Sequence, residues 1–426
     1  MSKLYIIITG TIFDIGGGQI YCRNKLNFLH DQGWDVHIFS YRYGNKILVR
    51  ELTKFRNNVI RSLKYAPTIF SLHHRKKLLH RILKTLQPSL SNSKLQQIIV
   101  ESHTIATSLW GEMLARRLNS KHIVYLLYES FGELDTCILD FFDFKHKRRE
   151  LAGINPKSLQ LLFKNYKCLA EGDKFRLNAA CTNVVEDTNG SFLENMDMED
   201  IKIGCISRLD KKFVMTLINE IISFAKKYPR RSLTVVIIGD STKYRTAKRI
   251  VAKQKGAKNV KFIMTGPLFP IPRKLFSMID IFFGVAGGAS LPAMEGALTV
   301  AVDIETHSAI GFLNRDSNQT FYGENRTKTS ISLVLEKVYI QNEIPSINHN
   351  FQVGILDYQI EYHKHMDFIK SSSKEKQYYD GQPELIFGLE ERLASRLMSA
   401  IGLKGFEMLY QLYPKYKRIW NQFLGY

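Results

Sequence analysis

Two cations follow a predicted strand in the middle of the chain. In the segment CISRLDKKF, residues 205–213, Arg208 and Lys212 come just after an apolar run that is typical of a buried strand. Ligands of open α/β sheets bind at the carboxyl ends of the strands. An arginine there offers a forked contact and a lysine a point charge, which together suit a diphosphate. The same residues also fit an ordinary solvated turn, and the segment by itself favours neither interpretation.

One carboxylate, Glu295, lies inside the almost uncharged run 281–302. A membrane-spanning helix needs roughly twenty apolar residues in helical order. Here several glycines and Pro292 instead predict a buried strand, a glycine-rich turn, a buried helix and a further strand. A carboxylate on such a helix is costly to bury unless it meets a partner or a ligand. The alternative is that Glu295 simply lies at the surface.

Glycines mark two predicted strand ends. The loop GGGQ, residues 16–19, includes Gly17 and Gly18 and separates the first predicted strand from the first helix; Gly239 ends the strand TVVIIGD, residues 234–240. Glycine lets the backbone approach a ligand closely, and a helix N-terminus favours phosphate or sugar oxygens. No GK[ST] follows GGGQ, which excludes a P-loop. A tight turn without a ligand explains either segment equally well.

Polar residues also end two strands of the first half. His103 follows the run IIVES, and Tyr128 and Glu129 follow YLL. We expect such ends to face a cleft between two α/β domains. Each is a candidate only, because a lone histidine is more often structural than catalytic.

Strands and helices alternate along most of the chain, which predicts parallel α/β sheets. The segment NAACTNVV, residues 178–185, is expected to be the last strand of the first half. The acidic stretch 186–200 is the best candidate for a linker, since the alternation restarts at residue 201. Residues 370–384 are predicted as a loop, and 385–426 as amphipathic helical material.

The composition constrains the class of protein. The chain has 426 residues, which favours two domains, and 45% of them are hydrophobic. Its net charge of +20 indicates an anionic partner, such as nucleic acid, an anionic membrane or phosphorylated ligands. The five cysteines show no CxxC pair and no metal-ligand spacing, as in a cytoplasmic protein with reduced thiols. No segment is typical of a signal peptide or a transmembrane helix, so we expect a soluble or peripheral protein.

The stretch 70–86, FSLHHRKKLLHRILKTL, predicts a basic amphipathic helix. Its leucines and isoleucine share one face and its histidines, lysines and arginines fill the rest. Such a helix suits the surface of an anionic membrane, and it equally suits a helix that packs on the core and solvates its basic face. Residues 413–420 interleave aromatics and cations in a similar, weaker pattern. Nucleic acid could use the same surfaces, although no nucleic-acid-binding motif accompanies them.

In their order, these motifs resemble the retaining glycosyltransferases of family 4, which have the GT-B fold. The likeness covers roughly residues 1–370 and follows the order GGGQ, ESH, YES, SRLDKK, VVIIGD, VKFIMTG and the 281–302 block. It implies two Rossmann-like domains with a cleft between them, at 1–190 for the acceptor and 199–370 for the nucleotide-sugar donor, and a C-terminal helical extension at 371–426. It also implies roles for the candidate residues. Arg208 and Lys212 would hold the donor diphosphate, and Glu295 would contact the ribose. Gly17 and Gly18 would approach the diphosphate or the acceptor, and His103 matches the first-half histidine.

The chain departs from the family's pattern in three places. The family has two glutamates separated by seven residues, and here Gly287 stands where the first would be. The spacing from Arg208 to Lys212 is one residue short of the usual one. Tyr128 and Glu129 occupy a strand end at which members often carry a histidine. These differences concern the identity of the sugar and the activity, and leave the fold unaffected.

The expected function is therefore transfer of a sugar, with retention, from a nucleotide-diphosphate sugar to an acceptor, in particular a lipid-linked or cell-envelope polysaccharide precursor. No DxD-type pair is placed to bind a metal, so we predict metal independence and no cofactor besides the donor substrate. The protein would be cytoplasmic, and peripheral on the inner face of the plasma membrane if its basic surface binds lipid. Two alternatives stay open: a non-catalytic relative that acts as a binding or scaffold subunit, and a nucleic-acid-binding protein, which charge alone suggests.

Overall fold

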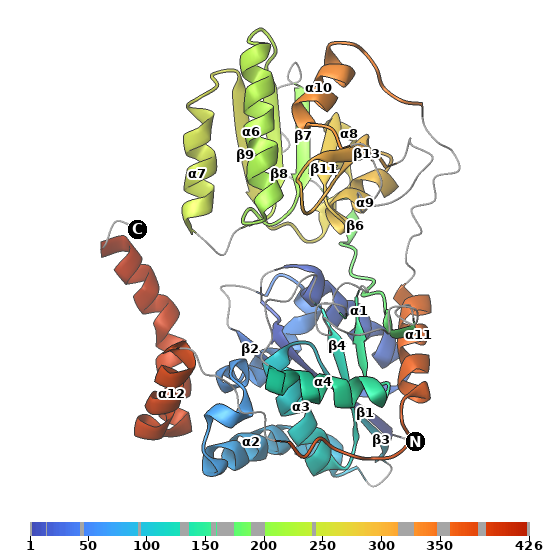
Figure 1. Cartoon of the computed structure of the whole chain (residues 1–426), viewed down its shortest axis with the longest axis vertical. Helices are drawn as coiled ribbons and strands as arrows, with labels where there is room; N and C mark the ends of the chain where they lie inside the picture. The colour runs from blue at the N-terminus through green and yellow to red at the C-terminus, as the bar shows by residue number, and fades with distance from the viewer. Residues whose placement is uncertain are drawn as a thin grey trace. The chain divides into compact units, whose positions relative to one another are not determined.

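The chain folds into two compact units in the computed structural model (Figure 1). Unit 1 comprises Met1–Cys181 and Leu356–Tyr426, and unit 2 comprises Thr182–Ile355. The structure describes residues 2–13, 15–42, 47–92, 95–127, 136–154, 159, 174–188, 201–240, 244–313, 328–346, 358–381 and 389–423. The predicted boundaries differ from these units in two respects: unit 1 ends near residue 181 instead of 190, and residues 356–426 belong to unit 1 instead of forming part of the donor domain and a separate extension.

Unit 1 is built on a five-stranded parallel sheet. Its strand order is β2-β1-β3-β4-β5. The strands are β1 (Ser2–Thr11), β2 (Trp34–Arg42), β3 (Leu95–Ser102), β4 (Lys121–Leu126) and β5 (Leu151–Gly153). Alternate side chains of β1 face opposite ways: Leu4, Ile6 and Ile8 join one buried cluster, while Tyr5 lies against the other face. The sheet is therefore covered on both faces, as its continuous apolar strands predict.

Helices on the two faces of this sheet come from distant parts of the sequence. Helix α1 (Gly17–Asp31) packs with α11 (Tyr358–Ser371), whereas α3 (Ile105–Leu118), α2 (Leu72–Leu90) and α12 (Leu389–Phe423) share the cluster on the opposite face. Three short 3₁₀ helices lead into α2, at Arg50–Asn58, Arg61–Lys64 and Pro67–Ile69, and α4 (Thr136–Lys147) precedes β5.

Residues 178–185 were expected to form the last strand of the first half, and that prediction is wrong. Only Val185 belongs to a strand, β6 (Val185–Glu186), which pairs with β10 (Ile271–Pro272) in unit 2. Ala180 has a φ of 41°, which interrupts an extended strand. Two carbonyls of this segment accept hydrogen bonds from side chains and not from a neighbouring strand. Tyr362 Oη donates to Ala179 O at 2.8 Å, and Asn24 Nδ2 donates to Ala180 O at 2.9 Å. Helices α1 and α11 thus fix the end of unit 1.

Unit 2 contains a six-stranded sheet of order β13-β12-β11-β7-β8-β9, parallel except for β13. The strands are β7 (Ile201–Ile206), β8 (Leu233–Ile238), β9 (Val260–Gly266), β11 (Ile281–Gly284), β12 (Thr299–Val302) and β13 (Ala309–Phe312). The helices are α6 (Lys212–Lys227), α7 (Tyr244–Gln254), α8 (Lys274–Met278), α9 (Gly287–Met294) and α10 (Ile331–Tyr339). The run 281–302 is strand, turn, helix and strand, which confirms the prediction.

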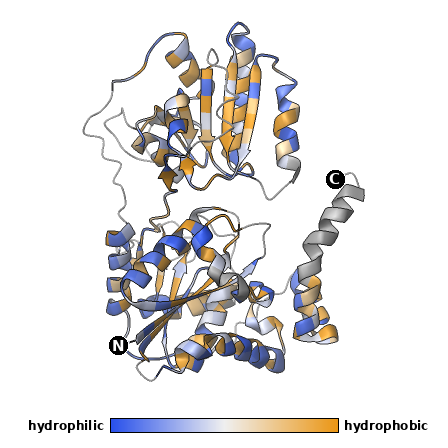
Figure 2. Cartoon of the chain, turned by 180° about the vertical axis from the view of Figure 1, so that it is seen from behind, coloured by the Kyte–Doolittle hydropathy of each residue, from blue (hydrophilic) through white to orange (hydrophobic). Residues whose placement is uncertain are grey.

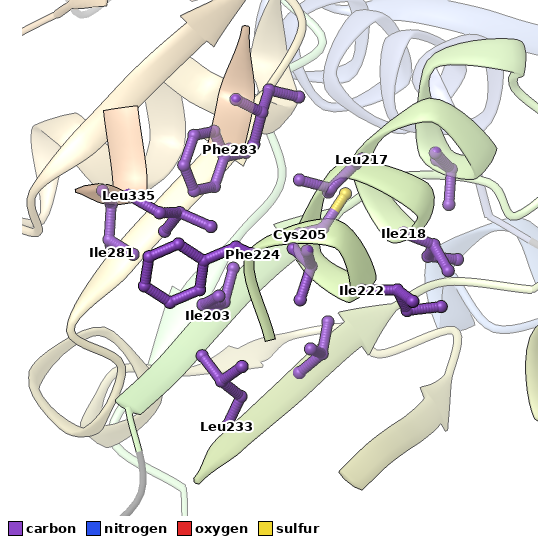
Figure 3. Packing of buried hydrophobic residues seen from close by; sticks show 14 of the residues in the cluster. Ile203, Cys205, Leu217, Ile218, Ile222, Phe224, Leu233, Ile281, Phe283 and Leu335 are labelled. Carbon is purple, nitrogen blue, oxygen red and sulfur yellow. The ribbon is translucent and has the colours of Figure 1, made fainter. Parts of the chain in front are cut away.

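The core of unit 2 also lies on both faces of its sheet. Figure 3 shows Cys205 of β7, Leu217 of α6 and Phe283 of β11 in one cluster, to which α10 adds Leu335. On the opposite face, α8 and α9 pack against the alternate strand residues, including Phe282. As a result, α6 and α9 leave the sheet on opposite faces.

Candidate functional site

The sheet of unit 2 has a topological switch point between β7 and β11. From β7 the chain proceeds to β8 on one side and returns to β11 on the other. The loop after β7 leads to α6 on one face, and the loop after β11 leads to α9 on the opposite face. In open α/β sheets, ligands bind where the connections diverge in this way, at the carboxyl ends of the strands.

Glycines bring three loops into backbone contact at this edge. A Cβ on Gly239, after β8, would lie 2.0 Å from the carbonyl oxygen of Ser207, and one on Gly288 would lie 2.2 Å from that of Ile206. A Cβ on Gly284 would in turn lie 2.5 Å from the Gly288 carbonyl oxygen. Since no other residue lacks a Cβ, the close packing of these loops requires glycine at all three positions.

Arg208 and Lys212 both lie at the switch-point edge. Arg208 belongs to the loop after β7, its side chain is 54% exposed, and its Nε lies 3.7 Å from Asp210 Oδ1, which is too long for a hydrogen bond. Lys212 is the first residue of α6 and is also exposed. Neither cation is committed to a short ion pair among the described residues, so both are available to an anion.

Glu295 caps the C-terminal end of α9, and its side chain is 17% exposed. Its Oε2 accepts a hydrogen bond from Arg273, which also donates from Nε to Asp187 Oδ1 at 3.1 Å. A largely buried carboxylate needs a partner or a ligand, and Arg273 is that partner. Oε1 accepts no hydrogen bond from the described residues, which leaves it for a ligand. Arg273 lies 22 residues before Glu295, beyond any local pattern that predicts the pair.

The position of the missing family carboxylate is open. Gly287 begins α9, and a Cβ placed on it would meet no atom within 4 Å. Ala286, directly before it, has a φ of 47°, a left-handed conformation that alanine rarely adopts. Such strain is common at ligand sites. A longer side chain at residue 287 would therefore fit sterically, although the chain carries none.

In unit 1, the corresponding switch point lies between β1 and β3, and the predicted residues gather there. Gly17 and Gly18 begin α1 after β1, and His103 follows β3. A Cβ on Gly17 would lie 3.2 Å from Cys181 Sγ, whereas one on Gly18 would meet nothing within 4 Å. Gly18 therefore has the space that an approaching ligand needs, and Gly17 is confined on one side.

His103 is 1% exposed, and both of its ring nitrogens are engaged inside unit 1. Nδ1 lies 2.9 Å from Thr9 Oγ1 and Nε2 lies 2.8 Å from Glu101 Oε1. These bonds favour a structural role, and a catalytic role for His103 stays a prediction.

Glu101 is the centre of a buried polar network that the sequence analysis missed. Its carboxylate accepts hydrogen bonds from Tyr5, Tyr21 and His103, and Lys25 Nζ lies 3.9 Å from its Oε2. Burial raises the pKa of Glu101, but Lys25 and His103 more than offset that effect, and the pKa lies well below its usual value. Burial lowers the pKa of Lys25 to about 8, although Glu101 opposes this shift. The only sequence signal was charge within otherwise apolar segments.

Some predictions lie outside the described residues or stay untested. Tyr128 and Glu129 and most of the linker 186–200 are not among the described residues. Within the described part of the chain, no group of three or more His, Cys, Asp or Glu side chains could hold a metal ion. No helix described here is both long and apolar enough to cross a membrane. A cavity of about 410 Å³ beside β13 and α10 contains none of the predicted site residues.

Comparison with solved structures identifies the architecture. Neither protein-family models nor curated protein sequences give a match. The structure of Alr3699/HepE from Anabaena in complex with UDP and glucose has a TM-score of 0.55 at 12% identity, over 87% of this chain and 100% of that one. A glycosyltransferase from Rickettsia africae has a TM-score of 0.54 at 15% identity, over 87% of this chain and 94% of that one. The chain has the GT-B fold. At these identities the likeness establishes the fold alone, and it confirms the two Rossmann-like domains that the sequence predicted.

Proposed function

We propose that the protein is a glycosyltransferase that transfers a sugar from a nucleotide-diphosphate sugar to an acceptor. The observation that carries the proposal is the switch-point edge of unit 2. There the exposed Arg208 and Lys212, the glycine-packed loops and the start of α9 lie at the carboxyl ends of β7, β8 and β11. Solved structures of the same fold hold UDP and UDP-glucose, which supports a nucleotide sugar as the donor.

The chemistry of such a transfer sets the task of each donor-site residue. Breaking the bond between sugar and diphosphate leaves negative charge on the departing diphosphate and positive charge on the sugar ring. Arg208 would stabilise the leaving group by forked hydrogen bonds and Lys212 by its point charge. Glu295, oriented by Arg273, would accept a hydrogen bond from a ribose hydroxyl through its free Oε1, and Gly239 would admit the donor close to the backbone.

For the acceptor we infer a glycan or a lipid-linked precursor of a cell-envelope polysaccharide. The net charge of +20 supports an acceptor that carries phosphate or lies at an anionic membrane. In unit 1, Gly17 and Gly18 would contact the acceptor, and His103 would contribute through the network that surrounds it. Retention of configuration and independence of metal ions belong to this proposal and derive from the family resemblance.

A ligand screen tests the donor assignment. A ligand that binds only the folded protein raises its thermal stability by mass action. We expect one of UDP, GDP, ADP, CMP or their sugars to raise the melting temperature, and Glu295→Gln to weaken that ligand through the loss of a ribose contact. Glu336→Gln, which alters a carboxylate paired with Lys227 on α6, is the control. If no nucleotide shifts the melting temperature, the donor assignment is wrong.

A second candidate function is a non-catalytic binding or scaffold subunit. Gly287, with open space where the family has a carboxylate, favours it. Calorimetric titration with the nucleotide sugar that stabilises the protein, combined with an assay of donor hydrolysis and transfer, separates the two functions. Tight binding without turnover would support the subunit, and turnover would exclude it.

A further inference from the structure

Helix α2 exposes a face that carries only positive charge. Four cations of this helix are solvent-exposed, namely Lys76, Lys77, Arg81 and Lys84. None of them has an ion-pair partner among the described residues. The helix contains no Asp or Glu. Its opposite face is buried through Leu78, Ile82 and Leu86. From the sequence, the helix could either pack on the core or lie on a membrane. In the structure it packs on the core and still presents its cations outward.

The first part of α12 lies beside α2 and is held firmly there. Ala394 and Met398 share a buried cluster with α2, and the two helices are neighbours in Figure 2. The buried Glu407 accepts hydrogen bonds from the backbone of Arg61 at 3.1 Å and of Ser62 at 2.9 Å. The helix is therefore anchored to unit 1 on its inner side.

The outer side of α12 exposes an apolar row. Leu393, Leu397 and Ile401 follow at intervals of four residues, so they lie on one helical face. Their exposed fractions are 49%, 40% and 41%. Gly402 interrupts the helical geometry directly after this row. The first turn contains two acids, Glu390 and Glu391. Glu390 is paired with Lys64, which reduces the negative charge at the start of the row and leaves Glu391 as the acid beside it.

We propose that α2 and the first part of α12 form one docking surface for an anionic lipid bilayer. The cations of α2 would attract acidic headgroups, and the three apolar side chains of α12 would insert among the acyl chains. Interfacial binding needs both contributions, since its strength depends on buried apolar area together with electrostatic attraction. This surface goes beyond the proposed sugar transfer, because its binding does not require a functional donor site.

Two other occupants fit the surface less well. A nucleic acid would use the cations, but its phosphates offer nothing to an exposed leucine and isoleucine row. A second copy of the chain could cover the apolar row, but a symmetric pairing would bring two unpaired basic α2 faces toward each other. The combination of charge and apolar side chains therefore favours the bilayer.

Vesicle flotation tests the proposal with the full-length protein. We expect binding to vesicles of phosphatidylglycerol and phosphatidylcholine in equal parts, and none to phosphatidylcholine alone. Removal of the four α2 charges should weaken binding by roughly two to three orders of magnitude, at about fivefold for each cation. Removal of the apolar row should weaken it by roughly ten- to a hundredfold. The variants are K76Q/K77Q/R81Q/K84Q and L393S/L397S/I401S.

Matched controls in unit 2 remove the same charge and a similar apolar area elsewhere. They are R249Q/K253Q/K255Q/K258Q and V251S/L333S/I340S, which alter exposed side chains. Both should bind vesicles like the parent protein, and the melting temperature of every variant reports its folding. In a Leu393→Trp variant, the tryptophan fluorescence that exceeds that of the parent protein should shift to shorter wavelength when anionic vesicles are added. Insertion of residue 393 among the acyl chains requires this shift.

Three results would overturn the proposal. The first is unchanged vesicle binding by either α2 or α12 variant. The second is binding of RNA at physiological salt that depends on α2 but not on the apolar row, which would indicate a nucleic-acid surface. The third is a dimer in sedimentation that dissociates when the apolar row is replaced, which would assign the row to a second copy. A variant that loses nucleotide binding should still bind vesicles. Failure of the donor assignment can therefore be distinguished from failure of the membrane proposal.

Discussion

Each of the two sheets has a topological switch point, but the charged residues at the two points differ in burial and bonding. At the edge of unit 1, the buried Glu101 and His103 are hydrogen-bonded to each other, and the buried Lys25 lies 3.9 Å from the Glu101 carboxylate. At the edge of unit 2, Arg208 and Lys212 are exposed and uncommitted. The same topology thus carries charge that stabilises the fold in one unit and charge that is available to a ligand in the other. Position at a strand end does not by itself identify a catalytic residue.

The largest expected effect concerns the buried charge of unit 1. Glu101→Gln should destabilise the protein by roughly 3–5 kcal/mol, because it leaves Lys25 buried without a counter-charge. Lys25→Met should cost clearly less, since Glu101 keeps its hydrogen bonds from Tyr5, Tyr21 and His103. Urea denaturation of both variants measures the difference. Equal losses would mean that these hydrogen bonds do not sustain the buried Glu101 charge without Lys25.

In unit 2 the corresponding change should affect activity and leave stability intact. Arg208→Ala should lower turnover by roughly two to three orders of magnitude, as expected when one strong transition-state contact is lost. Its melting temperature should stay near that of the parent, because the side chain is half exposed. Arg231→Ala, in the exposed turn after α6, is the matched control. Wild-type kinetics in Arg208→Ala would refute the assigned role.

Two adjacent glycines allow a sharper comparison within the switch-point edge. Gly288→Ala should destabilise unit 2 by roughly 1–3 kcal/mol, because its Cβ would lie 2.2 Å from a backbone oxygen. Gly287→Ala should be neutral or slightly stabilising, since its Cβ has open space and alanine favours the helix. Thermal melting reports both. If Gly288→Ala were also neutral, the close packing of the β7 and β11 loops would not be a requirement of the fold.

The smallest effect is a pH dependence of unit 1. Burial and, to a smaller extent, the nearby Lys25 lower the pKa of His365 to about 3, while the unfolded chain has the ordinary value near 6.5. Between these values the unfolded state binds a proton that the native state does not, so stability falls as pH decreases, by at most about 1.4 kcal/mol per pH unit. His365→Gln, which keeps a donor for Asn178 O, should flatten this decline between pH 6 and 4.5 in urea titrations. If the slope of stability against pH were the same in this variant, the decline would belong to other titratable groups.

Much of the fold could be predicted from the sequence because its signals are local. Apolar runs gave strands such as β8, and the glycines and Pro292 distinguished the 281–302 segment from a membrane helix. Residues 178–185 were assigned wrongly because their apolar character resembles a strand, while the donors that satisfy their carbonyls come from α1 and α11. That information lies more than 150 residues away in the sequence.

The candidate site was predictable to a similar extent. Arg208 and Lys212 stand directly after a strand, so topology alone places them at the ligand edge. The partner of Glu295 could not be predicted, because Arg273, the N-cap of α8, comes from a separate element 22 residues earlier. The internal bonds of His103 were also hidden, since Thr9 comes from β1, more than ninety residues earlier.

The return of residues 356–426 to unit 1 has a consequence for biosynthesis. Residues 182–355 are continuous, so unit 2 has all of its sequence once residue 355 has left the ribosome. Unit 1 begins first, yet the hydroxyl of Tyr362 and the imidazole of His365, which cap the carbonyls of residues 178 and 179, are translated more than 180 residues later. Domains fold as units once their chain is complete. The half of the molecule that emerges earliest is therefore the last to acquire its native hydrogen bonds.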